Sequence, residues 1–200
     1  MKQLIVGLVF LCGMMQHVTA QRVFSEGILR YDVFVNNSEQ PDGVYIVTIK
    51  NGFIKRELAM HSGYNNIVLY NHSTGISTSL SMDQDVRYAL QMSASELQER
   101  NKKFEHAVFT ENKEKKKIAG FACKSTSVKY ADGEVADLFF TPDLLPPNDF
   151  FLMMFPGLKG IPLEYEVASN ATLKMKFKAT VIKTKSIDSN LFNIPKEYKI

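Results

Sequence analysis

Residues 144–158 constrain the fold of this chain more than any other part of the sequence. They read LLPPNDFFLMMFPGL, with large apolar side chains throughout and one charged residue, Asp149. Proline has no amide hydrogen and clashes with the preceding turn of a helix, so Pro146, Pro147 and Pro156 exclude one long helix or a central strand here. Side chains this apolar must still be removed from water. We therefore expect residues 144–158 to be covered either by a sheet or by a bound molecule.

Most of the remaining chain carries the patterns of β-strands. Apolar and polar residues alternate along residues 27–35 and 173–185, which is typical of strands with one buried and one solvated face. Asn51-Gly52 and Ala131-Asp132-Gly133 supply turn chemistry and predict two hairpins. The predicted strands are residues 27–35, 44–50, 53–60, 67–70, 76–82, 86–92, 107–111, 118–130, 134–141, 163–167 and 173–185. We expect one β-rich domain over residues 21–200, beginning as an antiparallel meander.

Three further segments depart from this pattern. Ser93 and Glu96 have the spacing of a capping box, which predicts a short polar helix over residues 94–103. Residues 113–117 read KEKKK and are interpreted as the solvated tip of a hairpin, with a contact to anionic lipid as the alternative. Residues 187–200 contain several apolar side chains, so we expect this tail to pack against the sheet.

The first 20 residues have the layout of a secretory signal. Lys2 precedes an apolar run over residues 4–15, and Val18-Thr19-Ala20 fits a cleavage site. We expect cleavage after Ala20 and a periplasmic or secreted protein. The run is shorter than the ~20 apolar residues that cross a membrane, so no transmembrane segment is expected after cleavage. A lipidated Cys12 is the alternative, but Leu11 stands where a small residue is expected.

Charge and cysteine content narrow the class of partner. Removal of residues 1–20 takes away Lys2 and no acidic residue, which lowers the formal net charge from +3 to +2. This balance is too mild to predict binding to nucleic acid or strong attraction to a membrane surface. Cys123 is the only cysteine beyond residue 20, so the core must stabilise the fold without an intramolecular disulfide. We expect a monomer.

The sequence lacks the usual patterns of catalytic and metal sites. His61, His72 and His106 fall on different predicted elements without ligand spacing. No Gly-x-Ser-x-Gly elbow, phosphate loop or dinucleotide-binding glycine pattern occurs. Cys123 has no second thiol near it and is interpreted as a small buried apolar residue. We predict no catalytic residue, metal or cofactor. A hydrolase stays as an alternative if a histidine, a serine and an acid converge in one cleft.

Three motifs carry a resemblance to a known family. They are residues 118–124 (IAGFACK), 140–144 (FTPDL) and 158–166 (LKGIPLEYE). In these motifs the chain resembles uncharacterised exported envelope proteins of Gram-negative bacteria that carry a domain of unknown function, themselves distantly similar to the periplasmic lipoprotein-localisation carriers. The resemblance extends over most of residues 21–200. It implies a mainly β fold: a strongly curved antiparallel sheet, an incomplete barrel, with one or two short helices and an apolar loop across its concave face.

Two functional hypotheses follow from these observations. In the first, the chain is an exported non-enzymatic binding protein that holds a lipid or a lipid-modified partner, such as a lipoprotein, in an apolar concavity. Residues 144–158 then form either a plug that completes the core or a mobile lid whose methionines adapt to acyl chains. The candidate ligand-binding residues are Leu144, Leu145, Phe150, Phe151, Met153, Met154 and Phe155. In the second hypothesis, the chain is a structural or protein-interaction module of the cell envelope without a small-molecule ligand.

Overall fold

The chain folds into strands with a few short helical segments. The computed structural model describes residues 21–83, 86–168 and 172–200, so the predicted signal over residues 1–20 lies outside the described residues. The strands are β1 (Arg22–Val23), β2 (Glu26–Val35), β3 (Gly43–Lys50), β4 (Phe53–Met60), β5 (Asn65–Asn71), β6 (Ile76–Asp83), β7 (Val86–Met92), β8 (Val108–Ile118), β9 (Phe121–Lys129), β10 (Val135–Thr141), β11 (Leu144–Leu145), β12 (Ile161–Ala168) and β13 (Lys174–Lys183). The helical segments are α1 (Ala94–Asn101) and the 3-10 turns η1 (Lys102–Phe104), η2 (Asp149–Leu152) and η3 (Ser189–Phe192).

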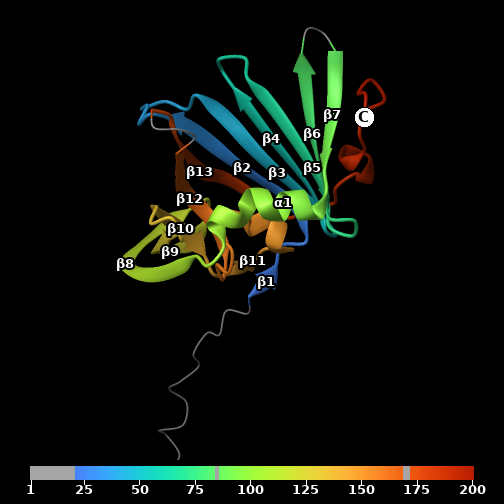
Figure 1. Ribbon diagram of the computed structural model, residues 1–200. Helices are drawn as coiled ribbons and strands as arrows, with labels where there is room; N and C mark the ends of the chain where they lie inside the picture. Colours follow the sequence, from blue (N-terminus) through green and yellow to red (C-terminus); the bar gives the residue numbers. More distant parts are fainter. Residues whose placement is uncertain (1–20, 84–85, 169–171) are drawn as a thin grey trace, which may run out of the picture.

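One large antiparallel sheet holds the described strands together. Its strands are ordered β7-β6-β5-β4-β3-β2-β13-β12-β10-β9-β8, while β1 and β11 form a small parallel pair beside it. The edge strands β7 and β8 do not meet, so the sheet is curved but not closed into a barrel (Figure 1). Within the described residues, no helix is long and apolar enough to cross a membrane. The prediction of a mainly β, antiparallel, incompletely closed fold is confirmed.

Local chemistry explains the elements that sequence patterns predicted well. The hydroxyl of Ser93 accepts the amide of Glu96, and the Glu96 carboxylate accepts the amide of Ser93, so the predicted capping box begins α1. Asn51 and Gly52 adopt positive φ angles of 46° and 90°, which close the hairpin between β3 and β4. Both predictions depend on neighbouring residues alone, and both are confirmed.

The interpretation of residues 113–117 as a hairpin tip is wrong. These residues lie inside β8, and the turn to β9 is made by Ala119 and Gly120, with φ angles of 47° and 88°. A two-residue turn of this kind needs residues that tolerate positive φ, which lysines disfavour. Because β8 is an edge strand, most of its charged side chains stay in water while they guard the edge against pairing with another chain, and Lys116 instead pairs with Glu164.

Residues 144–158 pack against the inner face of the sheet, which is defined here as the face that α1 and this segment cover (Figure 1). The segment joins one continuous core with the apolar side chains of β2, β3, β10 and β12. On the inner face, an aromatic cluster forms the centre of this core. Its members are Tyr31, Tyr45, Tyr165 and Phe177, with ring centroids 5.0–6.1 Å apart.

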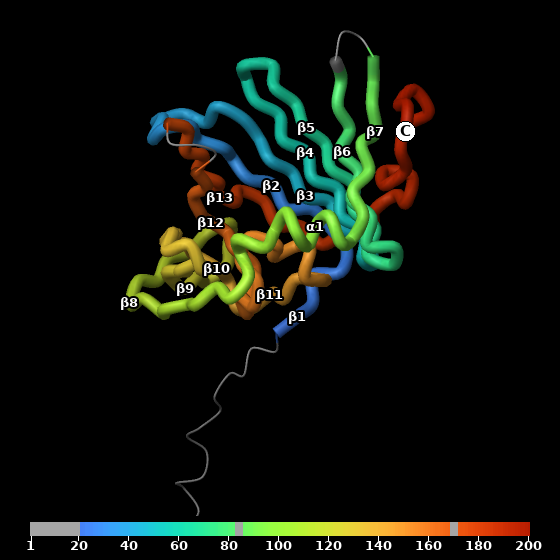
Figure 2. The backbone as a smooth tube through the Cα atoms, in the orientation of Figure 1, coloured from blue at the N-terminus to red at the C-terminus, as the bar shows by residue number. Residues whose placement is uncertain are grey.

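The C-terminal tail covers the opposite face and part of one edge. Ile194 and Tyr198 pack on a small second core of Leu69, Leu80 and Ala89. The backbone of Lys199 pairs with β7, accepting from the Ala89 amide at 2.7 Å and donating to the Arg87 carbonyl at 2.9 Å. Figure 2 shows this tail running beside β7. The expectation that residues 187–200 pack against the sheet is confirmed.

We expect Phe151→Asp to lower the free energy of unfolding by at least ~3 kcal/mol, because it removes a buried ring and places a carboxylate without a partner in the core. Urea denaturation followed by circular dichroism measures this change. Val135→Asp is the matched control, since Val135 is 58% exposed. Equal stability of Phe151→Asp and wild type would show that residues 144–158 do not contribute to the core.

Candidate functional site

The structure places the predicted ligand-binding residues in or beside the core. Leu144, Phe150, Phe151 and Phe155 are buried, while Leu145, Met153 and Met154 are half-buried. The cavity between this segment and the aromatic cluster is about 40 Å³, little more than the ≈30 Å³ that one water molecule occupies in the liquid. Residues 144–158 therefore fill the inner face here as a plug, and a ligand contact by these seven residues stays a prediction.

Arg56 fastens this plug to the sheet. It extends from β4 on the inner face, and its Nη2 donates to the carbonyls of Phe150 at 2.7 Å and Phe151 at 3.2 Å. The guanidinium carbon lies 4.5 Å from the centre of the Phe150 ring, which also stacks on Tyr70 with ring centroids 3.8 Å apart. Among the described residues, no carboxylate pairs with Arg56, and its buried Nε has no hydrogen-bond partner. A positive charge is thus held on the inner face by carbonyl oxygens and an aromatic ring.

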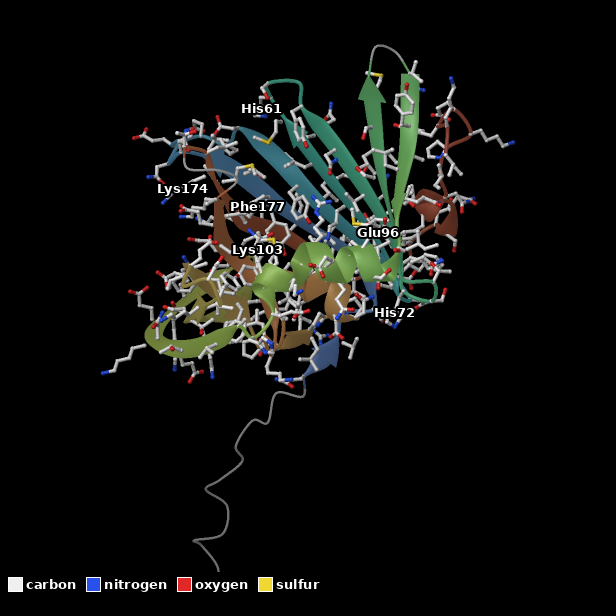
Figure 3. The ribbon with its side chains drawn as sticks, viewed as in Figure 1. His61, His72, Glu96, Lys103, Lys174 and Phe177 are labelled. Carbon is white, nitrogen blue, oxygen red and sulfur yellow. The ribbon has the colours of Figure 1, made fainter. Side chains whose placement is uncertain are left out.

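An apolar groove continues the inner face beyond the plug. Its volume is about 580 Å³, and it lies where β2 and β4 end and β13 begins. The residues that line it are Val35, Asp42, Leu58, Met60, His61, Ser62, Tyr64, Leu173 and Met175. Leu58 pairs with Tyr45 across β3 and β4, and Val35 pairs with Met175 across β2 and β13, so the groove borders the aromatic cluster. Figure 3 shows His61 at this end of the sheet and Phe177 further inside.

The groove is open to solvent although its side chains are mainly apolar. Leu58, Met60 and Met175 are half-buried, and Tyr64 is 57% exposed. Apolar side chains that face water in a concave surface are typical of binding sites, whereas single exposed apolar residues are common on any protein. We call these nine residues the inner-face groove and treat them as the candidate ligand site.

The described residues contain no arrangement typical of a metal centre. No group of three or more His, Cys, Asp or Glu side chains could hold a metal ion in this part of the chain. His61 and His72 lie at opposite ends of the molecule, as Figure 3 shows. His106 follows η1 with a φ angle of 58°.

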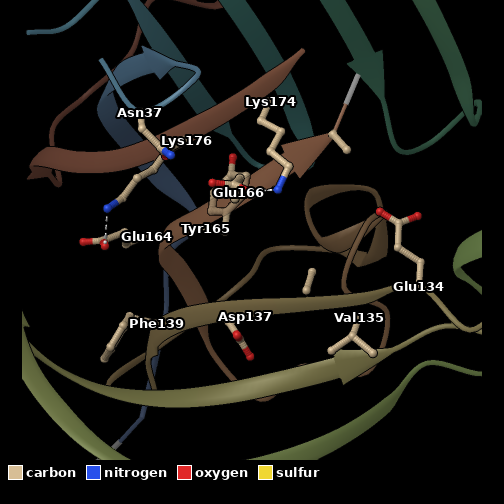
Figure 4. A pocket seen from close by; sticks show the side chains of 12 residues that line it. Asn37, Glu134, Val135, Asp137, Phe139, Glu164, Tyr165, Glu166, Lys174 and Lys176 are labelled. Carbon is tan, nitrogen blue, oxygen red and sulfur yellow. Dashed lines mark ion pairs between the residues drawn. The ribbon is translucent and has the colours of Figure 1, made fainter. Parts of the chain in front are cut away.

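A charged pocket lies on the opposite face of the sheet, over β10, β12 and β13 (Figure 4). Its volume is about 450 Å³, and Glu164 in its lining pairs with Lys176 at 3.1 Å and with Lys116 at 2.8 Å. Burial alone would raise the pKa of Glu164, but the hydrogen bonds and charges of the two lysines outweigh it and hold the pKa below its ordinary value. Two of its acids, Glu164 and Glu166, pair with Lys176 and Lys174 of the same lining, which is typical of a structural charge network.

Cys123 is an inert thiol in this structure. Its side chain is 3% exposed, and its Sγ lies 3.5 Å from the Phe121 carbonyl oxygen. Burial raises the pKa of the Cys123 thiol to about 11, although nearby groups, including Lys116, oppose the increase. The interpretation of Cys123 as a small buried apolar residue is confirmed.

Comparisons with known proteins add a partial likeness of fold. No family model matches the sequence, and no curated protein matches it. A crystal structure of PNGF-II covers 84% of this chain with a TM-score of 0.44 and 14% identity, and this chain spans 30% of its length. The crystal structure of MucB, which has also been solved with MucA from Pseudomonas aeruginosa, covers 90% of this chain with a TM-score of 0.47 and 12% identity. This chain spans 61% of that MucB structure.

A third solved structure is the Mycobacterium tuberculosis lipoprotein LppX. It covers 77% of this chain with a TM-score of 0.42 and 8% identity, and this chain spans 85% of its length. The resemblance to exported envelope proteins and to lipoprotein-localisation carriers stays a prediction.

Sequence patterns alone did not single out the inner-face groove. Alternation along residues 173–185 placed Met175 on an apolar strand face, whereas residues 53–60, with Leu58 and Met60, were predicted as a strand from the adjoining turn alone. No local signal shows which part of such a face is left uncovered, because that depends on where a distant segment packs.

We expect Glu164→Gln to lower stability by about 1–2 kcal/mol at neutral pH, the range for a hydrogen bond to a charged group. A carboxylate with a lowered pKa stabilises the fold above the unfolded-chain value of about 4.3 and loses this contribution as the pH falls through the lower folded value. The variant should therefore lose less stability than wild type below about pH 5. Urea midpoints from pH 7 to pH 3 measure this, and parallel pH profiles would contradict the assignment.

We expect Cys123 to react with iodoacetamide at least ~100-fold more slowly in the native protein than in urea, because burial both blocks access and lowers the thiolate fraction. Mass spectrometry of residues 21–200 after timed alkylation at pH 8 measures the two rates. Similar rates would contradict the burial of this thiol.

Proposed function

We propose that this protein is an exported, non-enzymatic binding protein that holds the acyl chain of a lipid or lipid-modified partner in the inner-face groove. One observation carries the proposal: an apolar groove of about 580 Å³ lies open on the inner face and borders a buried aromatic cluster. This volume falls within the range of roughly 300–1,000 Å³ that small-molecule sites occupy.

The lining of the groove suits a flexible apolar ligand. Met60 and Met175 supply thioether side chains that change shape at little cost, while Leu58 and Val35 supply branched apolar surface. Each methylene group of a chain that is buried there contributes roughly 0.8 kcal/mol. Asp42 and His61 lie at the rim, where they leave most of the surface apolar.

In this proposal the plug closes one side of the binding surface. Phe150 packs near α1, and Phe151 and Phe155 pack beside the aromatic cluster. The apolar space that these buried rings fill is not available to a ligand. The acyl chain instead lies further along the same face, over β2, β4 and β13. The proposed ligand class agrees with the sequence hypothesis, whereas the proposed contact residues differ from its candidates.

The alternative is a module that binds a protein partner through its sheet edge or its exposed loops. Binding through the sheet edge would need an exposed edge strand that is free of charge. Along the described part of β8, the edge is strongly charged, and on β7 the backbone at Arg87 and Ala89 already pairs with Lys199. Both arrangements protect sheet edges from pairing with a partner strand. The edges thus favour the ligand-binding proposal over β-strand addition.

The first experiment is native mass spectrometry with organic extraction of residues 21–200 purified from a bacterial periplasm. We expect a co-purifying lipid. Binding of pyrene-labelled phosphatidylcholine, which has no net charge, then quantifies the site. Met175→Glu should weaken binding about tenfold or more, since it places a carboxylate against the acyl chain.

Val181→Glu is the matched control because Val181 lies on the same strand, is 41% exposed and does not line the groove. It should bind the probe like wild type. An absence of lipid together with equal, negligible binding by all three proteins would contradict the proposed function.

A further inference from the structure

A second cavity lies beside the inner-face groove, between α1 and strands β4 to β7. Its volume is about 170 Å³. The residues that line it are Arg56, Asn66, Val68, Ser77, Ser79, Leu90, Met92, Leu97, Arg100, Asn101, Phe150 and Met153. Half of these side chains are polar or positively charged, in contrast to the groove. We call this cavity the arginine pocket.

The arginine pocket carries positive charge without a compensating acid in its lining. Arg56 reaches it from the sheet and Arg100 from the last turn of α1. Arg100 is exposed, and within the described residues it forms no ion pair. The acids of α1 are engaged elsewhere, because Glu96 closes the helix cap with Ser93 and Glu99 pairs with Lys102 at 3.5 Å. The terminal nitrogens of Arg56 already contact the plug, so Arg56 contributes mainly its charge, whereas Arg100 offers free donors. A free guanidinium beside a second positive charge is suited to a phosphate or carboxylate group.

Small polar side chains complete the donor set. Ser77 and Ser79 lie on β6, and the Nδ2 of Asn66 donates to the Ser79 hydroxyl at 3.4 Å. Asn101 adds an amide from the end of α1. Hydroxyl and amide groups of this size can donate to an anionic oxygen beside the two arginines.

The arginine pocket and the inner-face groove are neighbours on one face of the sheet. Asn66 of the pocket is the direct cross-strand partner of Leu58 of the groove. Arg56 lies two residues before Leu58 on β4, so both side chains extend from the same face. The acidic residue Asp42 lines the groove at its other end. The inner face is therefore polarised, with positive charge at the pocket and apolar surface next to it.

We infer that the arginine pocket takes the anionic headgroup of an amphiphile whose acyl chain lies in the inner-face groove. The inference rests on the proposed function and adds a ligand class to it: lipids with a phosphate or carboxylate that carries net negative charge. Asp149 and Glu105 line an adjoining cavity next to α1, and neither of them lines this pocket.

The test compares two pyrene-labelled lipids with identical acyl chains, anionic phosphatidylglycerol and phosphatidylcholine without net charge. Wild-type protein should bind phosphatidylglycerol about tenfold more tightly at low salt, the effect of one hydrogen-bonded charge pair, and this preference should shrink as salt is raised. Arg100→Gln should bind phosphatidylglycerol more weakly than wild type and lose most of the preference. Glycerol phosphate, which lacks an acyl chain, should not displace either probe.

Lys103→Gln is the matched control. It removes one positive charge next to α1 from an exposed residue that neither lines the arginine pocket nor pairs with Glu99, and it should keep the preference. Equal affinity of wild-type protein for the two lipids would overturn the inference and leave the proposed function in place. Failure of the wild-type protein to bind either lipid would overturn both.

Discussion

The structure depends on how an open, curved sheet covers its own apolar inner face. A closed barrel would bury this face by itself, but the edges β7 and β8 do not meet. Residues 144–158 cover part of this apolar face, because Phe150, Phe151 and Phe155 pack against the sheet. Arg56 strengthens this contact, since its guanidinium satisfies two carbonyl groups in a segment whose prolines prevent regular hydrogen bonding.

The proposed activity follows from the part of the inner face that this segment does not reach. The segment and α1 cover the centre of the face, and the apolar residues at the ends of β2 and β4 and the start of β13 stay half-exposed. The free energy of protein and ligand in water falls when an apolar chain replaces water in a groove with this lining. The same arrangement that stabilises the plug leaves Arg56 at the boundary between the apolar groove and the polar pocket under α1. In the proposed function, Arg56 thus links the stability of the plug to the binding of a ligand.

Elements that depend on nearby residues could be predicted from the sequence. The capping box of Ser93 and Glu96 and the turn at Asn51-Gly52 are formed by side chains or φ angles within a few positions. Strand alternation also identified the apolar faces. The basic run of residues 113–117 misled the prediction because a cluster of lysines fits an exposed edge strand as well as a turn.

The candidate site could not be predicted in the same way. Its walls depend on long-range pairing, such as Val35 with Met175 across β2 and β13. The plug residues were identified as important because they are strongly apolar, but the same property is expected of a core segment and of a ligand contact. Phe150 and Phe151 can be assigned to the core only from the structure, where they are buried and their carbonyls accept from Arg56.

The most direct test of this account is a crystal structure of residues 21–200 with a lipid that carries bromine atoms on its acyl chain. Anomalous scattering from bromine gives the position of the chain independently of any model. The account predicts bromine peaks between Leu58 and Met175, with residues 144–158 still packed on the inner face. Bromine peaks beneath a displaced segment 144–158, in the space that Phe150 and Phe155 now fill, would contradict it.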